Sequence, residues 1–344
     1  ADTVDAAGVP GITLEAALQL FLAFFTANDP AIKSYALQAL GGLCCARPKF
    51  LLVKGVDKVM KATMHLDADW KLKDRALRNL TELVRSEEEG MIDKQARLMS
   101  DRSEGGPIEQ PLAKVVGERD DNHAGGIVQR YWDGVMRLAT DARVVDADKP
   151  EEAPQNAVVR MRVLELCEAV LRQGMVHPMS CFPSLIALCC DPSDQARRKA
   201  LQLLRQETEK HPTFFDTRLA DGLTSAHAFR ERLQRAFHGG PGRTSVEALA
   251  GLGDVYRIVR EAKTTRTRFL STVIRPLEHT HAEKELDLRF MSFITDVLST
   301  LPYSKLDEPL LVVHTINRIV ALRAGTVLEA LKSAVGGKED GGST

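Results

Sequence analysis

Histidine, cysteine and carboxylate side chains are the groups in this chain that could catalyse a reaction or hold a metal ion. The densest cluster joins His279 and His281 to Glu278, Glu283 and Glu285, and these are residue types that bind zinc. They fall in a polar turn between two expected helices, so we interpret them as solvated side chains. The sequence also lacks the G-x-S-x-G, H-E-x-x-H, phosphate-loop and dinucleotide-binding patterns. It therefore predicts no catalytic residue, no metal and no cofactor.

The cysteines form neither a disulfide framework nor a zinc framework. No C-x-x-C occurs, and two vicinal pairs lie inside apolar stretches that we expect to be helical. Reduced thiols of this kind suit the core of an intracellular protein. We interpret all six in this way: Cys44, Cys45, Cys167, Cys181, Cys189 and Cys190.

Basic side chains are concentrated in one part of the chain. Residues 197–275 hold sixteen basic and eight acidic residues, a formal charge of +8, whereas the whole chain carries −1. Arginine predominates there, and its guanidinium suits phosphate oxygens or acidic protein surfaces. An ordinary solvated helix face is the alternative, and the sequence leaves both open. The candidates for contact with DNA or a partner are Arg197, Arg198, Lys199, Arg257, Arg260, Lys263, Arg266, Arg268 and Arg275.

Contact between these side chains and DNA would go mainly to phosphates. Binding of double-stranded DNA would then be sequence-nonspecific and strongly salt-dependent. No aromatic residues alternate with the arginines, which argues against stacking on single strands.

The overall composition excludes some classes of protein. The 344 residues are 44% hydrophobic and 27% charged, and 46 basic residues face 47 acidic ones, so no global charge attracts the chain to DNA or membrane. The longest apolar runs, such as Cys181–Cys190, are about half the length of a bilayer-spanning helix. We expect no membrane association. The chain shows no secretory signal and starts at Ala1 rather than Met, so we expect it to be part of a longer protein.

An internal repeat decides the expected architecture. Four segments share one frame: an apolar residue, a basic residue, and then small or apolar residues at helical spacing. They begin at Ile32, Leu72, Val159 and Ala196, and offsets of 40 and 37 residues flank one of 87. A period near 40 with helical spacing indicates stacked helix pairs, and the offset of 87 indicates one repeat plus an insertion.

Each frame follows an apolar stretch that would form the first helix of its pair. Asp29-Pro30 and Asp191-Pro192 fit an aspartate N-cap followed by proline in the first turn. The pattern resembles the HEAT repeat, so the predicted fold is an all-α, curved and hook-like solenoid. The expected first helices are Leu14–Phe25, Val56–Met64, Ile127–Ala139 and Cys181–Cys190.

The basic residue of the frame is Lys33, Lys73, Arg160 or Arg197. Nucleic-acid contact is one interpretation. We favour the other, because in HEAT-like repeats this position pairs with an acidic group of the neighbouring turn and forms a ladder.

We predict one solenoid over residues 1–344. After Pro212 the frame fades but helical periodicity persists. Two polar insertions, expected to be part helix and part loop, interrupt the array. The expected parts are two repeats at 13–85, a polar insertion at 86–126, repeats at 127–212 with an acidic connection at 141–156, C-terminal helical repeats at 213–335 and a flexible tail at 336–344.

One segment resembles a known family. The stretch Gln173–Leu188, followed by Asp191-Pro192, is similar to the signature segment of the Nipped-B family of sister-chromatid cohesion loaders. Further similarities follow in order along residues 13–332, although Lys263–Arg268 is less basic than the family pattern. We interpret the signature residues as largely structural: Gly174, His177, Pro178, Cys181, Pro183, Asp191 and Pro192.

The resemblance implies a function. A Nipped-B loader is not an enzyme: its C-terminal HEAT hook grips the SMC heads and the kleisin of cohesin, clamps DNA against them and stimulates the cohesin ATPase. This would place the chain in the nucleus, on chromatin. The small loader subunit would bind an N-terminal part that is absent here.

Two other functions stay open on the sequence alone. A generic HEAT adaptor would bind proteins without touching DNA. A HEAT-like DNA glycosylase would need aromatic residues around a carboxylate, and the two tryptophans, Trp70 and Trp132, belong to separate repeats. We rank the enzyme last.

Overall fold

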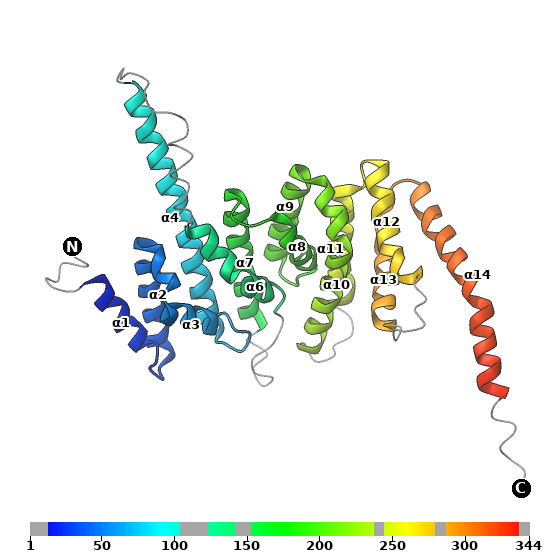
Figure 1. The fold of residues 1–344 in the computed structure, drawn as a ribbon. Coiled ribbons are helices and arrows are strands. Elements are labelled where there is room, and N and C mark those ends of the chain that lie inside the picture. The colour runs from blue at the N-terminus through cyan, green and yellow to red at the C-terminus, as the bar shows by residue number, and fades with distance from the viewer. Residues whose placement is uncertain (1–12, 104–122, 142–152, 237–243, 279–286, 337–344) are drawn as a thin grey trace, which may run out of the picture.

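The computed structural model describes residues 13–103, 123–141, 153–236, 244–278 and 287–336. These parts are built of helices and contain no strand. Figure 1 shows the helices stacked side by side in an elongated row, with α1 and α14 at opposite ends. The predicted all-α solenoid is confirmed.

The elements follow one another in pairs along the chain. They are α1 (Leu14–Phe24), α2 (Pro30–Ala46), the 3₁₀ helix η1 (Pro48–Leu52), α3 (Lys54–Thr63), α4 (Trp70–Ser103), α6 (His123–Ala139), α7 (Ala153–Gln173), the 3₁₀ helix η4 (Pro178–Ser180), α8 (Phe182–Leu188), α9 (Asp194–Lys210), α10 (Pro212–Ala236), α11 (Thr244–Val259), α12 (Lys263–Glu278), α13 (Leu288–Thr300) and α14 (Asp307–Gly336).

The helices form two layers. In one layer α2, α4, α7, α9, α11 and α13 each contact the next. In the other, α1 contacts α3, and α6, α8, α10, α12 and α14 form an unbroken series. The four frames lie on α2, α4, α7 and α9, which are the second helices of their pairs. The two-layer order therefore continues to α14, beyond the point where the sequence frame fades.

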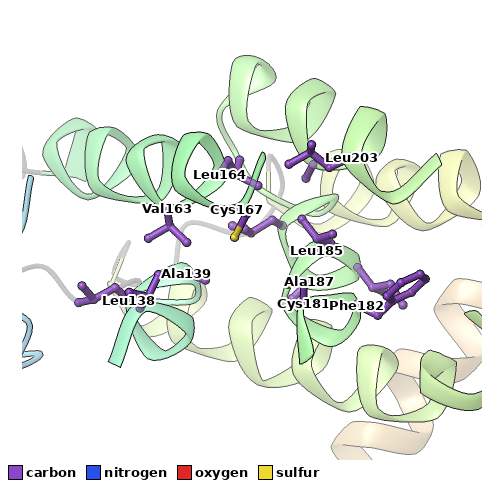
Figure 2. Close-up of a cluster of buried hydrophobic side chains, with 14 of the residues drawn as sticks. Leu138, Ala139, Val163, Leu164, Cys167, Cys181, Phe182, Leu185, Ala187 and Leu203 are labelled. Carbon is purple, nitrogen blue, oxygen red and sulfur yellow. The ribbon is translucent and has the colours of Figure 1, made fainter. Parts of the chain in front are cut away.

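One apolar core runs through the array. Buried side chains extend without a break from Leu18 to Val312, as expected when each pair covers the apolar face of its neighbour. Figure 2 shows one section, in which Val163 of α7 and Leu185 of α8 lie among the buried side chains between α6 and α9.

The cysteines belong to this core. All six are free thiols, and five of them are buried. Burial raises the pKa of Cys44 and of Cys190 to about 12, so neither presents a reactive thiolate near neutral pH. The interpretation as core thiols is confirmed for the five buried cysteines, whereas Cys45 is half-buried.

The aspartate caps differ between the two predicted positions. Asp29 caps α2 as expected, accepting the Ala31 N–H at 2.7 Å. Asp191 does not cap α9, because that helix begins at Asp194 with Ser193 at the N-cap position. The Asp191 carboxylate is buried and accepts the Ser193 N–H at 2.8 Å. This turn separates it from the helix, so the capping prediction is wrong there.

The predicted insertions and tail are described only in part. Residues 86–103 continue α4, which projects beyond the row (Figure 1), whereas 104–122 lie outside the described residues. Residue 141 and residues 153–156 of the acidic connection are described, and 142–152 are not. The His279–Glu285 cluster and residues 337–344 of the tail also lie outside the description.

Candidate nucleic-acid interface

The basic frame position forms a ladder through the middle repeats. Lys73 of α4 pairs with Asp141 at 3.2 Å, and both side chains are buried. Arg160 of α7 pairs with Asp191 through Nε at 2.5 Å and Nη2 at 3.1 Å, and its Nη1 donates to the Asp141 carbonyl at 3.2 Å. Each basic residue thus reaches the turn of a neighbouring repeat, which confirms the favoured interpretation for these two positions.

The outer frame residues have other partners. Arg197 pairs with Asp194 and donates to the backbone carbonyls of Asp191 and Pro192 at 2.9 and 3.2 Å. Lys33 lies over the Phe25 ring at 6.0 Å. Neither repeats the buried carboxylate pairing seen at Arg160.

A second buried pairing of this kind occurs on α12. Arg266 is 2% exposed, and it pairs with Asp307 at 3.0 Å and with Glu308 at 3.3 Å. Its Nη1 also donates to the Arg260 carbonyl at 2.9 Å. Arg266 therefore holds α12 against the start of α14 and presents no guanidinium to an outside phosphate. This corrects its prediction as a contact residue.

Most of the other predicted contact residues already have protein partners. Lys199 pairs with Glu168 at 2.5 Å, and Arg257 pairs with Asp254. Arg260 is half-buried and donates to the Pro302 carbonyl at 3.2 Å. Because these side chains point toward different neighbours, the Arg257–Arg268 stretch does not form one surface.

Arg198 differs from its neighbours at the start of α9. Its side chain is 83% exposed and lies 3.5 Å from Asp194. It stays a candidate contact residue, separate from those on α12.

A groove on α12 brings three of the predicted residues together. Lys263, Arg268 and Arg275 line it with Thr264, Thr267, Ser271 and Thr272, in two rows spaced four residues apart on one face of the helix. Asp216 of α10 and Glu278 complete the lining, and the volume is about 760 Å³. We call this surface the α12 groove.

The α12 groove has uncompensated positive charge. Asp216 is paired with Arg268 at 3.1 Å, and Glu278 with Arg318 at 2.8 Å. Lys263 and Arg275 are exposed and make no ion pair with the described part of the chain. Two cations therefore stay available beside four hydroxyl groups.

This lining suits phosphate. Ammonium and guanidinium groups supply charge, and hydroxyls add hydrogen-bond donors of the kind that contact DNA backbones. The twelve helical steps from Lys263 to Arg275 rise about 18 Å, the axial length of about five base pairs. The arrangement predicts backbone contact without base recognition.

We did not predict from the sequence that hydroxyl groups line this surface. The four-residue spacing from Lys263 to Arg275 was a usable signal, because it places these side chains on one helical face.

Comparison with known proteins identifies the family. The family model described as "Sister chromatid cohesion C-terminus" matches residues 124–319, which include the ladder from Asp141 to Asp191 and the α12 groove. The chain belongs to the Nipped-B family. The resemblance inferred from the Gln173–Leu188 segment is thereby confirmed.

Individual Nipped-B relatives match over nearly the whole chain. Nipped-B-like protein A of Danio rerio is 24% identical over 93% of this chain, and Nipped-B-like protein of Homo sapiens is 22% identical over 92%. Nipped-B protein of Drosophila melanogaster is 23% identical over 94%. The chain spans 13%, 11% and 15% of these proteins, respectively.

The Nipped-B signature segment shapes the turn between α7 and α8. Gly174 has φ of +66°, where glycine is favoured, and the following Met175 N–H bonds to the Val170 carbonyl at 3.1 Å. His177 Nδ1 accepts the Met179 N–H at 3.3 Å.

The rest of the signature is equally local. Pro178 and Pro183 lie in the first turns of η4 and α8, and Cys181 is buried. Asp191 and Pro192 supply the carboxylate and a carbonyl described above. In this structure, the signature residues stabilise the turns that connect α7, α8 and α9.

Within the described ranges, no cluster of three or more His, Cys, Asp or Glu side chains is arranged to hold a metal ion. No helix there combines the length and the apolar character needed to cross a membrane.

Proposed function

We propose that this chain is a non-catalytic scaffold of cohesin loading, and that its α12 groove holds duplex DNA. Its partners would be the SMC heads and the kleisin of cohesin, on chromatin in the nucleus, and the hook would favour the state in which the cohesin ATPase is active. Membership of the Nipped-B family supports the loading role. The free charges of Lys263 and Arg275 beside four hydroxyls support the DNA contact.

The mechanism would be differential binding. A scaffold that contacts DNA and cohesin together stabilises the state in which both are held, and it shifts the population of its partner toward that state. No bond is made or broken by the scaffold itself.

Neutralising the α12 groove tests the DNA contact. We expect the triple variant Lys263→Gln, Arg268→Gln and Arg275→Gln to bind duplex DNA roughly 100-fold more weakly at low salt, because the two free cations are lost and Arg268 no longer neutralises Asp216. The slope of log K against log salt should fall in magnitude by about 2, one for each free cation. Fluorescence anisotropy with two duplexes of unrelated sequence measures both quantities.

The matched control removes three exposed arginines from other helices. Arg85→Gln, Arg235→Gln and Arg289→Gln change the net charge equally but leave α12 intact. If both triple variants lose the same salt slope, the α12 groove is not the DNA contact.

A pull-down tests the cohesin partner. Purified ATPase heads with kleisin should be retained by the immobilised chain, and retention should survive nuclease treatment. The alternative, a protein adaptor without DNA contact, predicts an unchanged DNA salt slope in the α12 variant. Failure to retain cohesin would remove the loading role from this chain.

A further inference from the structure

A second concave surface lies at the other end of the array, between α3 and α6. Asp57 of α3 joins the two helices: it accepts from Arg130 Nε and Nη2 at 2.9 Å each, from Lys61 Nζ at 2.9 Å and from the Tyr131 hydroxyl at 3.0 Å. The Leu51 carbonyl oxygen lies 3.2 Å from the same Tyr131 hydroxyl and shares its single proton with Asp57. These bonds fix the positions of α3 and α6, although they are far apart in the chain.

The resulting cleft has an apolar lining and a charged rim. Met64 and Leu66 line it beside Gly134, while Lys61, Arg130 and Arg137 stand around it, and its volume is about 620 Å³. We call it the α3–α6 cleft. This volume lies within the range of ordinary ligand sites, about 300–1,000 Å³.

Gly134 keeps the α3–α6 cleft open. A Cβ placed there would lie 3.9 Å from Met64 Cβ and 3.9 Å from Arg137 Nη2. These are ordinary contacts, so a small side chain would fit without strain, whereas a large one would occupy the apolar part of the cleft.

The charges around the α3–α6 cleft favour an acidic occupant. Lys61, Arg130 and Arg137 line the cleft with Asp133 and the paired Asp57, and Asp67 lies 3.3 Å from His65 of the lining. Lys54 and Lys58, exposed on the same face of α3 as Lys61, add two cations beside it, so five cations stand against three carboxylates. Hydrogen bonds from Arg130, with Lys61 and Tyr131, hold the pKa of Asp57 well below its usual range.

Arg137 is the second cation that α6 contributes to the α3–α6 cleft. It is exposed and makes no ion pair within the described ranges. The guanidinium of Arg137 could therefore pair with a carboxylate that enters the α3–α6 cleft. It lies beside Arg130 and Lys61, which Asp57 holds in place.

We propose that the α3–α6 cleft binds an acidic peptide segment of a protein partner. Carboxylates of the peptide lie against Lys61 and Arg137 of the lining and Lys58 beside it, and an apolar side chain packs on Leu66 and Gly134, over the buried Met64. The apolar lining distinguishes this surface from the α12 groove, where hydroxyls alternate with cations. A phosphate backbone has nothing to place against Met64 and Leu66, so a peptide is the better match.

The experiment uses a fluorescein-labelled twelve-residue peptide of glutamate and aspartate with two central leucines, and the full 344-residue chain. We expect saturable binding that weakens roughly tenfold in Lys58→Glu with Arg137→Glu, because two attractions become repulsions. Neither residue contacts Asp57, so thermal unfolding should be unchanged.

A second variant separates shape from charge. Gly134→Leu fills the apolar part of the cleft, so it should weaken the leucine-containing peptide and leave the same peptide with serines in place of leucines unaffected. The α12 variant should bind both peptides as the parent chain does, and the Lys58→Glu with Arg137→Glu variant should keep most of its DNA affinity.

The opposite results would overturn the proposal. These are no saturable peptide binding, equal affinity in the charge-reversed variant, or a loss of DNA affinity in that variant without a loss of peptide affinity. The last outcome would assign the α3–α6 cleft to nucleic acid. The α12 result is independent, so the failure of one proposal leaves the other standing.

Discussion

Replacement of Arg160 by methionine is expected to lower the stability of the fold by about 3–5 kcal/mol. The side chain of Arg160 is buried and lies over the Phe229 ring at 5.5 Å while it pairs with Asp191. Methionine keeps much of the packing volume but leaves the Asp191 carboxylate buried without a cation. Urea unfolding followed by circular dichroism at neutral pH measures the loss.

The control for this prediction removes the stranded carboxylate as well. Arg160→Met with Asp191→Leu should recover most of the lost stability, because an apolar pair needs no compensation. Arg198→Met, at an exposed position of α9, should change the urea midpoint little. A loss below about 1 kcal/mol in Arg160→Met would mean that water or another cation compensates Asp191.

Gly251→Ala is expected to destabilise the protein by about 3 kcal/mol or more, the upper end of what overpacking costs. A Cβ at Gly251 would lie 1.8 Å from the Cys189 carbonyl oxygen and 2.6 Å from its carbon. Both atoms belong to the backbone at the end of α8, so no side-chain rotation relieves the clash, and α11 must move. Thermal and urea unfolding report the change.

Gly42→Ala is the matched control. It lies inside α2, and a Cβ there would meet nothing within 4 Å. Alanine should therefore be neutral or stabilising by about 0.5–1 kcal/mol, since glycine is the poorer helix former. Equal stability of Gly251→Ala and the parent chain would show that α11 does not approach α8 this closely in solution.

The helix pairs could be predicted because the signal repeats. The frame beginning at Ile32, Leu72, Val159 and Ala196 fixed the helical face and the period together, and the ladder residues Lys73 and Arg160 followed from their place in it. Such local, repeated patterns can be recognised without knowledge of the tertiary contacts.

The contact residues could be predicted only in part. The charge density of a stretch of sequence does not predict the direction of each side chain. In the structure, Arg257, Arg260 and Arg268 contact different neighbours. Arg266 did carry a local signal. With Phe269, it lies on the apolar face of α12 at three-residue spacing, and such a position predicts burial.

The α3–α6 cleft had no comparable signal. Asp57 and Arg130 are 73 residues apart, and the sequence between them contains no repeat from which their contact could be predicted. Asp57 and Arg130 meet only because α3 and α6 are neighbours in the stack. That neighbourhood is a property of the folded arrangement and cannot be read from the sequence.

Asp141 belongs to two repeats at once, and this has a mechanical consequence. Its carboxylate holds Lys73 of α4, and its carbonyl holds Arg160 of α7, so a strain that shifts either helix is transmitted to the other. Paired substitutions at Lys73 and Arg160 should then be non-additive. An array coupled in this way yields to tension in cooperative blocks of several helices rather than one hairpin at a time.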